Sequence, residues 1–238
     1  MSETTSGRRY VDALDGLRAL CVLGVLGYHM GVGQCSGGLL GVTVLFVLSG
    51  YLITSQLVST YAKNHRQLSL REFWMKRVRR LMPSVVVLIV VTAALCTLFN
   101  HVLLTKMRPD IVPSLLMYLN WAKIFSNESY FAAAGAPSPL THFWSLAIEA
   151  QFYLIWPPIL LLLMNMHSRK RHVAIGCVVL AILSAVLMAM TYSPNADPSR
   201  AYYGTDTRAM SLLLGCALAL VWPFGRASRA DASTMSVR

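Results

Sequence analysis

Long apolar runs constrain the fold of this chain more than any other feature. A helix needs about 20 mainly apolar residues to cross a bilayer. Six runs qualify or nearly do, and they comprise residues 17–33, 39–61, 81–104, 140–166, 173–192 and 208–224. Only 13% of the 238 residues are charged, about half the share of an ordinary soluble domain, which leaves too little polar surface to cover the particle in water. The sequence therefore predicts an all-α, polytopic transmembrane helix bundle.

The basic residues predict how this bundle lies in the membrane. The chain has 21 Lys and Arg against 10 Asp and Glu, and most of the basic residues flank the apolar runs, as in cytoplasmic loops. These residues are Arg8, Arg9, Lys63, Arg66, Arg71, Lys76, Arg77, Arg79, Arg80, Arg169, Lys170, Arg171, Arg226 and Arg229. Their alternation predicts six spans with both termini in the cytoplasm. Because topology explains these charges, no nucleic-acid partner is expected.

A further apolar segment at 111–125 is short and is interrupted by Pro113, Asn120 and Lys123. Counting it as a seventh span would put the basic residues 169–171 outside the cell, so it is expected to be re-entrant or interfacial. The cysteines form no Cys-x-x-Cys pair, and no metal site is predicted. A single transmembrane domain is expected at 1–225, followed by a polar cytoplasmic tail at 226–238.

Arg18 and His29 are ionisable residues inside the first span, where a charge is costly. They are eleven residues apart, so they share one helix face at an axial offset of about 16 Å. Arg18 either anchors the helix at the cytoplasmic interface or binds an anionic ligand. His29 is either a hydrogen-bonded structural imidazole or a group for chemistry or proton transfer.

Glu149 lies in the fourth long run, with His142 seven and Ser145 four residues before it. This spacing places the three side chains broadly on one helix face, which predicts a polar stripe directed into the bundle. The stripe is either an interhelical hydrogen-bond network or a functional site.

Two further groups of charges have both a structural and a functional interpretation. Arg77 and Arg80 lie where the basic loop enters the third span, where they either set the topology or bind a phosphorylated ligand. Asp206 and Arg208 begin the last span, and the structural interpretation is that they pair with each other at the interface.

Five sequence blocks, in order, resemble the membrane acyltransferase 3 family over nearly the whole chain. They are LDGLRAL at 14–20 followed by His29, GVTVLFVLSGYLI at 41–53, FWMKRVRRLMP at 73–83, HFWSLAIEAQFY at 142–153 and YGTDTR at 203–208. The chain departs from the family at Thr43, where an acid is frequent, and at Ala150, where a second Glu is usual. The family core typically has ten spans, so a chain of about six is expected to be truncated or to need a partner chain for the missing spans.

The resemblance implies a multi-pass O-acyltransferase of the bacterial inner membrane. Such an enzyme moves an acyl group, usually acetyl, from cytoplasmic acyl-CoA to hydroxyls of an envelope glycan. Acyl-CoA would be a donor substrate, and no permanently bound cofactor is expected. An inactive remnant and a polytopic transporter remain as alternatives, although the transporter is disfavoured because no inverted repeat is visible.

The resemblance also suggests roles for the residues singled out above. Arg18, Arg77 and Arg80 would hold the phosphates of acyl-CoA, and the donor arm would run along the first span toward His29. His29 would act as general base or carry the acyl group, and Glu149 would orient it or stabilise its imidazolium. The residues expected to bind the acceptor are His142, Trp144, Ser145, Asp206 and Arg208.

Overall fold

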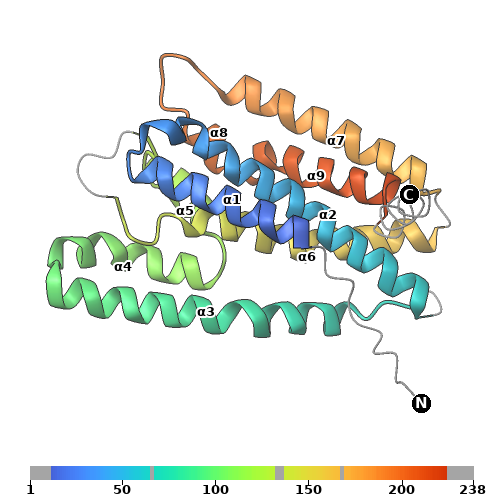
Figure 1. Cartoon of the computed structure of the whole chain (residues 1–238), viewed down its shortest axis with the longest axis horizontal. Coiled ribbons are helices and arrows are strands. Elements are labelled where there is room, and N and C mark those ends of the chain that lie inside the picture. Colours follow the sequence, from blue (N-terminus) through green and yellow to red (C-terminus); the bar gives the residue numbers. More distant parts are fainter. Residues whose placement is uncertain (1–11, 65–66, 132–136, 167–168, 224–238) are drawn as a thin grey trace, which may run out of the picture.

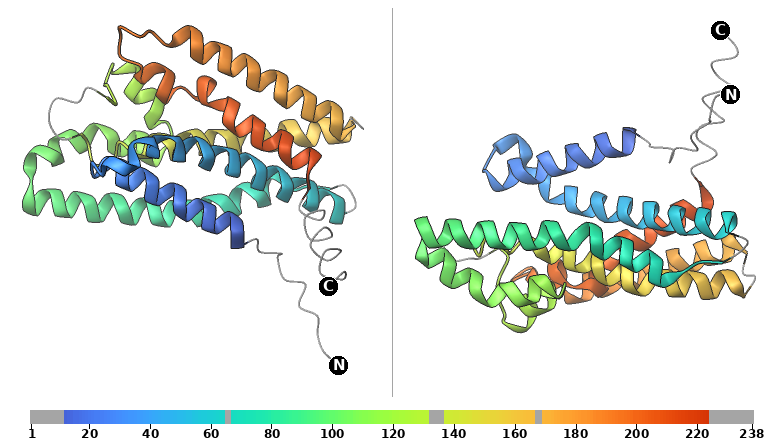
Figure 2. Two further views of the ribbon diagram at one scale, coloured as in Figure 1. Left: turned by 45° about the horizontal axis from the view of Figure 1, so that its top comes forward. Right: turned by 90° about the horizontal axis from the view of Figure 1, so that it is seen from below.

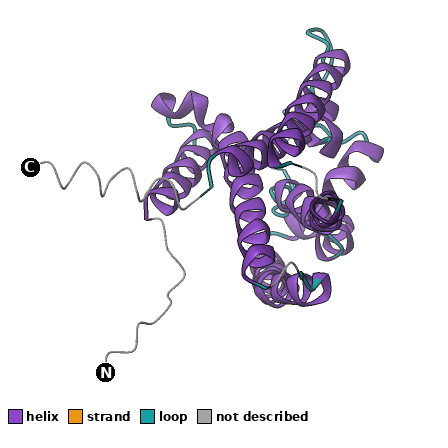
Figure 3. Ribbon diagram, turned by 90° about the vertical axis from the view of Figure 1, so that its right-hand side faces the viewer, coloured by secondary structure: helices purple, strands orange, loops and turns teal. Residues whose placement is uncertain are grey.

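The computed structural model describes residues 12–64, 67–131, 137–166 and 169–223. Within these ranges every regular element is helical (Figure 3), which confirms the predicted all-α class. The elements are α1 (Asp12–His29), η1 (Gly33–Leu39), α2 (Leu40–Lys63), α3 (Leu70–Phe99), α4 (His101–Leu115), α5 (Leu119–Phe125), α6 (Phe143–Asn165), α7 (Lys170–Thr191), α8 (Ser199–Tyr203) and α9 (Thr205–Val221). The predicted tail at 226–238 and the basic residues Arg8, Arg9, Arg66, Arg226 and Arg229 lie outside the described residues.

Four of the helical segments are long and apolar enough to cross a membrane, and they are Gly33–Lys63, Leu70–Phe99, Phe143–Asn165 and Lys170–Thr191. The other two predicted spans correspond to α1, with 18 residues, and α9, with 17. Helices α1, α3 and α7 run one way along the bundle, and α2, α6 and α9 run the other way (Figure 1). This alternation brings the start of α1 and the end of α9 to the same end of the bundle, as the predicted topology requires.

Helix α3 begins earlier than the apolar run that predicted it. The Ser69 side chain accepts a hydrogen bond from the backbone N–H of Glu72 and caps the first turn, which is the pattern of a capping box. The basic motif is therefore helical and continuous with the span. At the far end, Asn100 caps α4 by accepting from the N–H groups of Val102 and Leu103, so the chain turns there and does not continue to residue 104.

The segment predicted to be re-entrant is divided between α4 and α5. Helix α4 folds back along α3 (Figures 1 and 2), and the chain then turns at Met117, which has a positive φ of 57°. The fifteen residues of α4 and the seven of α5 are too few to cross a bilayer. Both short helices remain at one end of the bundle, near the beginning of α6, which agrees with the prediction of a segment that does not span.

Helices α2, α7 and α9 form the most closely packed part of the bundle. A Cβ atom added to Gly50 would lie 2.0 Å from the Leu212 carbonyl oxygen, and one added to Gly215 would lie 2.0 Å from the Val47 carbonyl oxygen. The backbones of α2 and α9 therefore meet where neither glycine has a side chain, as small residues allow in membrane bundles. By contrast, α1 lies at the edge of the bundle, where it packs mainly on η1 and α2 (Figure 2).

Candidate active site

A cavity of about 340 Å³ lies between α1, α2, α6 and the segment that follows α5. Its wall is mostly apolar, and the apolar lining residues are Val22, Val25, Leu26, Val42, Leu45, Phe46 and Trp144. The polar lining residues are His29, Tyr130, His142, Ser145 and Glu149. Mostly apolar walls with a few convergent polar groups are typical of a small-molecule or active site.

His29 is the last residue of α1, and both of its ring nitrogens are engaged. Nδ1 lies 2.8 Å from the Val25 carbonyl oxygen, and Nε2 lies 2.8 Å from the Tyr130 hydroxyl. A carbonyl only accepts hydrogen bonds, so Nδ1 carries the proton. In the neutral ring Nε2 is therefore the acceptor, and the Tyr130 hydroxyl donates to it. This tautomer presents the lone pair of His29 to a hydroxyl group, as general-base catalysis requires.

Tyr130 is the residue of this site that the sequence did not reveal. It belongs to the segment between α5 and α6, where no helical periodicity relates it to His29. Its ring lies against Tyr202 and Trp144, with centroid distances of 4.6 and 6.2 Å. Burial among these rings raises the pKa of the Tyr130 hydroxyl above its ordinary value, so at neutral pH this hydroxyl keeps the proton that it donates to His29.

His142 and Ser145 line the same cavity as Glu149, as their spacing in the sequence predicts. The rings of His142 and His29 meet edge to face with their centroids 4.6 Å apart. Desolvation, together with the neighbouring His29, lowers the pKa of His142 below the ordinary value. The Ser145 hydroxyl donates to the His142 carbonyl oxygen at 3.2 Å. Both side chains therefore line the cavity that contains His29, and His142 contacts the imidazole directly.

The carboxylate of Glu149 joins helices α2 and α6 beside the cavity. Ser49 of α2 donates to Oε1 at 2.8 Å, and Tyr153, one turn further along α6, donates to Oε2 at 3.1 Å. Because the His29 ring is occupied by Val25 and Tyr130, the expected direct contact between Glu149 and His29 is not formed, and that expectation was wrong. Glu149 and His29 share a cavity, but they belong to separate hydrogen-bond groups.

The arginines proposed to bind phosphates differ in their surroundings. Arg77 is half-buried, donates to the Gln56 side chain at 2.8 Å, and places its guanidinium 5.1 Å from the centre of the Tyr153 ring. Tyr153 thus contacts Arg77 with its ring and Glu149 with its hydroxyl. Arg18 is also partly buried and lies 3.4 Å from Asp15, whereas Arg80 is exposed on α3. The structure therefore connects Arg77 to the cavity wall and leaves Arg80 at the surface.

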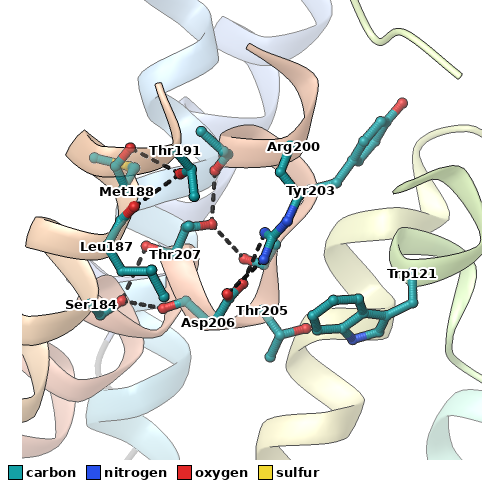
Figure 4. Close-up of polar contacts among 12 residues, drawn as sticks. Trp121, Ser184, Leu187, Met188, Thr191, Arg200, Tyr203, Thr205, Asp206 and Thr207 are labelled. Atoms are coloured by element: carbon teal, nitrogen blue, oxygen red, sulfur yellow. Dashed lines mark hydrogen bonds and ion pairs between the residues drawn. The ribbon is translucent and has the colours of Figure 1, made fainter. Parts of the chain in front are cut away.

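Asp206 and Arg208 do not pair with each other, so that prediction was wrong. Asp206 instead forms a bidentate ion pair with Arg200 of α8 (Figure 4). Nη1 of Arg200 donates to Oδ1 at 3.0 Å, and Nη2 donates to Oδ2 at 2.7 Å. Arg208 donates through Nε to the Tyr202 carbonyl oxygen and lies over the Tyr202 ring at 4.4 Å. On a helix, residues two apart face different sides. Both charges therefore bind residues of α8, namely Arg200 and Tyr202, and neither lines the cavity.

Trp144 lies between Tyr202 and the cavity. It is buried, and its ring contacts Phe46 at 6.1 Å and Tyr202 at 4.6 Å between centroids. Of the five residues expected to bind the acceptor, His142, Trp144 and Ser145 thus line the cavity.

The family model described as "Acyltransferase domain" matches residues 11–235. The chain belongs to this family. The match confirms the family assignment made from the five blocks, and the four long apolar helices agree with a multi-pass membrane protein.

Curated relatives of the family resemble this chain over most of its length. The chain is 49% identical to "Peptidoglycan O-acetyltransferase OatA" of Listeria monocytogenes over 96% of its residues, which corresponds to 37% of that relative. It is 48% identical to "Putative peptidoglycan O-acetyltransferase YrhL" of Bacillus subtilis, covering 96% of this chain and 36% of that relative. It is 42% identical to "O-acetyltransferase OatA" of Staphylococcus aureus, covering 90% and 35%. The chain thus spans little more than a third of the length of these relatives, and no solved structure matches it.

Proposed function

We propose that this chain transfers an acyl group, usually acetyl, from cytoplasmic acyl-CoA toward hydroxyls of an envelope glycan. The hydrogen bond between Tyr130 and Nε2 of His29 is the observation that carries this proposal. It places a proton acceptor against a hydroxyl at the edge of a cavity, in a family of acyltransferases. The names of the relatives indicate peptidoglycan as the glycan, and the bacterial inner membrane as the location follows from a donor and an acceptor on opposite sides.

His29 acts as a general base in the proposed reaction. Nε2 removes the proton from the hydroxyl that it contacts, and the resulting oxygen attacks the thioester carbonyl carbon. The new C–O bond forms as the C–S bond breaks, and the CoA thiolate takes a proton as it leaves. The engagement of both ring nitrogens favours this role over direct acylation of His29, because the acceptor nitrogen already faces a hydroxyl.

The hydroxyl that Nε2 contacts belongs to Tyr130, so Tyr130 is the proposed first acceptor. The acyl group would rest there as a phenolic ester until an acceptor hydroxyl attacks its carbonyl carbon from the outer side. His29 would take the acceptor's proton and return it to the Tyr130 oxygen as the bond between that oxygen and the acyl group breaks. His142, Trp144 and Ser145 would surround that acceptor, since they line the cavity beside His29. Glu149 would join α6 to α2 through Ser49, and Tyr153 would fix the orientation of its carboxylate.

Arg77 and Arg18 are the proposed contacts for the phosphates of acyl-CoA, with Arg80 as an outer contact. Arg77 contacts the ring of Tyr153, which is also bonded to Glu149 at the cavity, so a donor held at Arg77 would have a direct path to the cavity. Arg18 lies one turn before Val22, which lines the cavity on α1, so it belongs to the same helix face.

Transfer of radiolabelled acetyl from acetyl-CoA tests this function. Membranes containing the wild-type chain should place label on the protein when no glycan is added and pass it to peptidoglycan when glycan is present. His29→Ala should do neither. Absence of label from a folded wild-type chain would support the inactive-remnant alternative, and label restored by co-expression of a second chain would identify a partner that supplies further spans.

A further inference from the structure

Lys123 is the most unusual charge in the part of the chain that the structure describes. Its side chain is 2% exposed and lies 2.8 Å from Asp110 and 2.6 Å from Glu128. A buried ammonium is costly unless it is paired. Here one cation joins α4, which carries Asp110, to the segment after α5, which carries Glu128. From the sequence alone, Lys123 is recognisable only as an interruption of an apolar segment.

The backbone around Lys123 shows what the ion pair holds. The N–H of Glu128 donates to the Lys123 carbonyl oxygen, and the N–H of Asn127 donates to the Ile124 carbonyl oxygen. Asn127 has a positive φ of 53°. These are the features of a Schellman motif. In such a motif a hydrophobic contact usually joins the two positions that Lys123 and Glu128 occupy here. In this protein an ion pair replaces that contact and fixes the direction in which the chain leaves α5.

Tyr130 follows two residues after Glu128 and is anchored a second time. Its backbone N–H donates to the Ser199 hydroxyl at 2.8 Å, and that hydroxyl donates to Asp197 at 2.6 Å. The segment is therefore held from the α5 side by Lys123 and from the α8 side by Ser199. Between these anchors, the Tyr130 side chain reaches His29.

We propose that Lys123 is a positioning residue that, through Glu128, holds the Tyr130 hydroxyl on Nε2 of His29. This inference rests on the proposed function in one respect, namely that the Tyr130–His29 hydrogen bond serves the reaction. It requires no direct contact between Lys123 and substrate. Loss of the ion pair releases the α5 side of this segment and leaves Ser199 as its anchor, so the Tyr130 hydroxyl covers the lone pair of His29 for a smaller share of the time.

The accessibility of the His29 lone pair can be measured without any transfer reaction. Diethyl pyrocarbonate acylates neutral imidazole, and peptide mass spectrometry of the folded, detergent-solubilised chain reports the rate at each histidine. Tyr130→Phe should raise the rate at His29 roughly fivefold, the factor expected for opening one hydrogen bond. Lys123→Met should raise it by a smaller factor, about twofold to fivefold, because Ser199 still holds the Tyr130 backbone. The double variant should be no faster than Tyr130→Phe alone, because both changes open the same bond. The rate at His172, which is remote and exposed, serves as an internal reference.

Two further variants keep the test decisive. Glu128→Gln leaves the pair between Lys123 and the buried Asp110 intact and should still raise the rate at His29, which covers the case in which Lys123→Met does not fold. Lys76→Met removes an exposed ion pair with Glu72 and should leave the rate unchanged. Wild-type rates in Lys123→Met and Glu128→Gln, beside a raised rate in Tyr130→Phe, would overturn the role of Lys123 alone. A wild-type rate in Tyr130→Phe would overturn the hydrogen bond itself and, with it, both proposals.

Discussion

Nε2 of His29 lies 2.8 Å from the hydroxyl oxygen of Tyr130, although the two residues are 101 positions apart in the chain. His29 ends a membrane helix and Tyr130 belongs to a non-helical segment. A base and a hydroxyl supplied by separate elements can be tested separately.

Tyr130→Phe removes only the phenolic oxygen and keeps the ring among Trp144 and Tyr202. We expect labelling of the protein by radiolabelled acetyl-CoA to disappear and transfer to glycan to fall by a factor of about 10² to 10⁴, the range for a lost proton-transfer partner. Tyr192→Phe, at an exposed tyrosine after α7, should leave both unchanged. Transfer at the wild-type rate by Tyr130→Phe would exclude Tyr130 as first acceptor.

Arg77→Ala should weaken donor binding more than it slows chemistry. A lost hydrogen bond to a charged group is worth about 1.5–3 kcal/mol, which corresponds to a rise in KM for acetyl-CoA of roughly tenfold or more. Arg80→Ala, at an exposed position, should raise KM only about twofold, as for a surface ion pair. The measurement is initial rate against acetyl-CoA concentration, with the exposed Arg71→Ala as control. Equal effects of the Arg77 and Arg71 variants would contradict a specific phosphate contact.

Gly215→Ala should destabilise the packing of α2 on α9. The added Cβ would lie 2.0 Å from the Val47 carbonyl oxygen, and overpacking of this kind costs about 1–3 kcal/mol. Thermal unfolding in detergent should show a lower Tm. Gly176→Ala, in α7, meets nothing within 4 Å and should be neutral or stabilise by about 0.5–1 kcal/mol through its helix propensity. A wild-type Tm for Gly215→Ala would show that the two backbones separate without cost.

His142 should make stability depend on pH. Its pKa in the folded protein is lowered by desolvation and by His29, so below a pH of about 6.5 the unfolded chain binds a proton that the folded chain resists. Stability is therefore expected to be constant above that pH and to fall as the pH decreases through the folded-state pKa. His142→Gln should show a smaller loss of Tm between pH 7.5 and 5.5, and the exposed His172→Gln should behave as wild type. An unchanged slope in His142→Gln would assign the effect to another group.

The parts of the site that lie within one helix could be predicted from the sequence. His142, Ser145 and Glu149 reach the same cavity because the helical repeat fixes their relative directions. The spans were predicted for a similar reason, since length and hydropathy are local properties.

Contacts between elements could not be predicted in this way. The partners of Glu149 are Ser49 on another helix and Tyr153 on its own, and Arg200 reached Asp206 from a short helix that no pattern indicated. Tyr130 lies in a segment without periodicity. Lys123 interrupts an apolar segment, and only the fold shows that Asp110 and Glu128 neutralise it.

The edge position of α1 has a mechanical consequence. Near its middle, Gly24 approaches Gly38 so closely that a Cβ on Gly38 would lie 2.1 Å from the Gly24 carbonyl oxygen, while much of the remaining surface of α1 is exposed. Nearer to His29, an added Cβ on Gly27 would lie 2.6 Å from the Cys35 sulfur of η1. The position of His29 in the site therefore depends on close contacts between small residues of α1 and η1 and not on burial of the whole helix, so added bulk at Gly24, Gly27 or Gly38 would displace the base while leaving the packing of α2 on α9 intact.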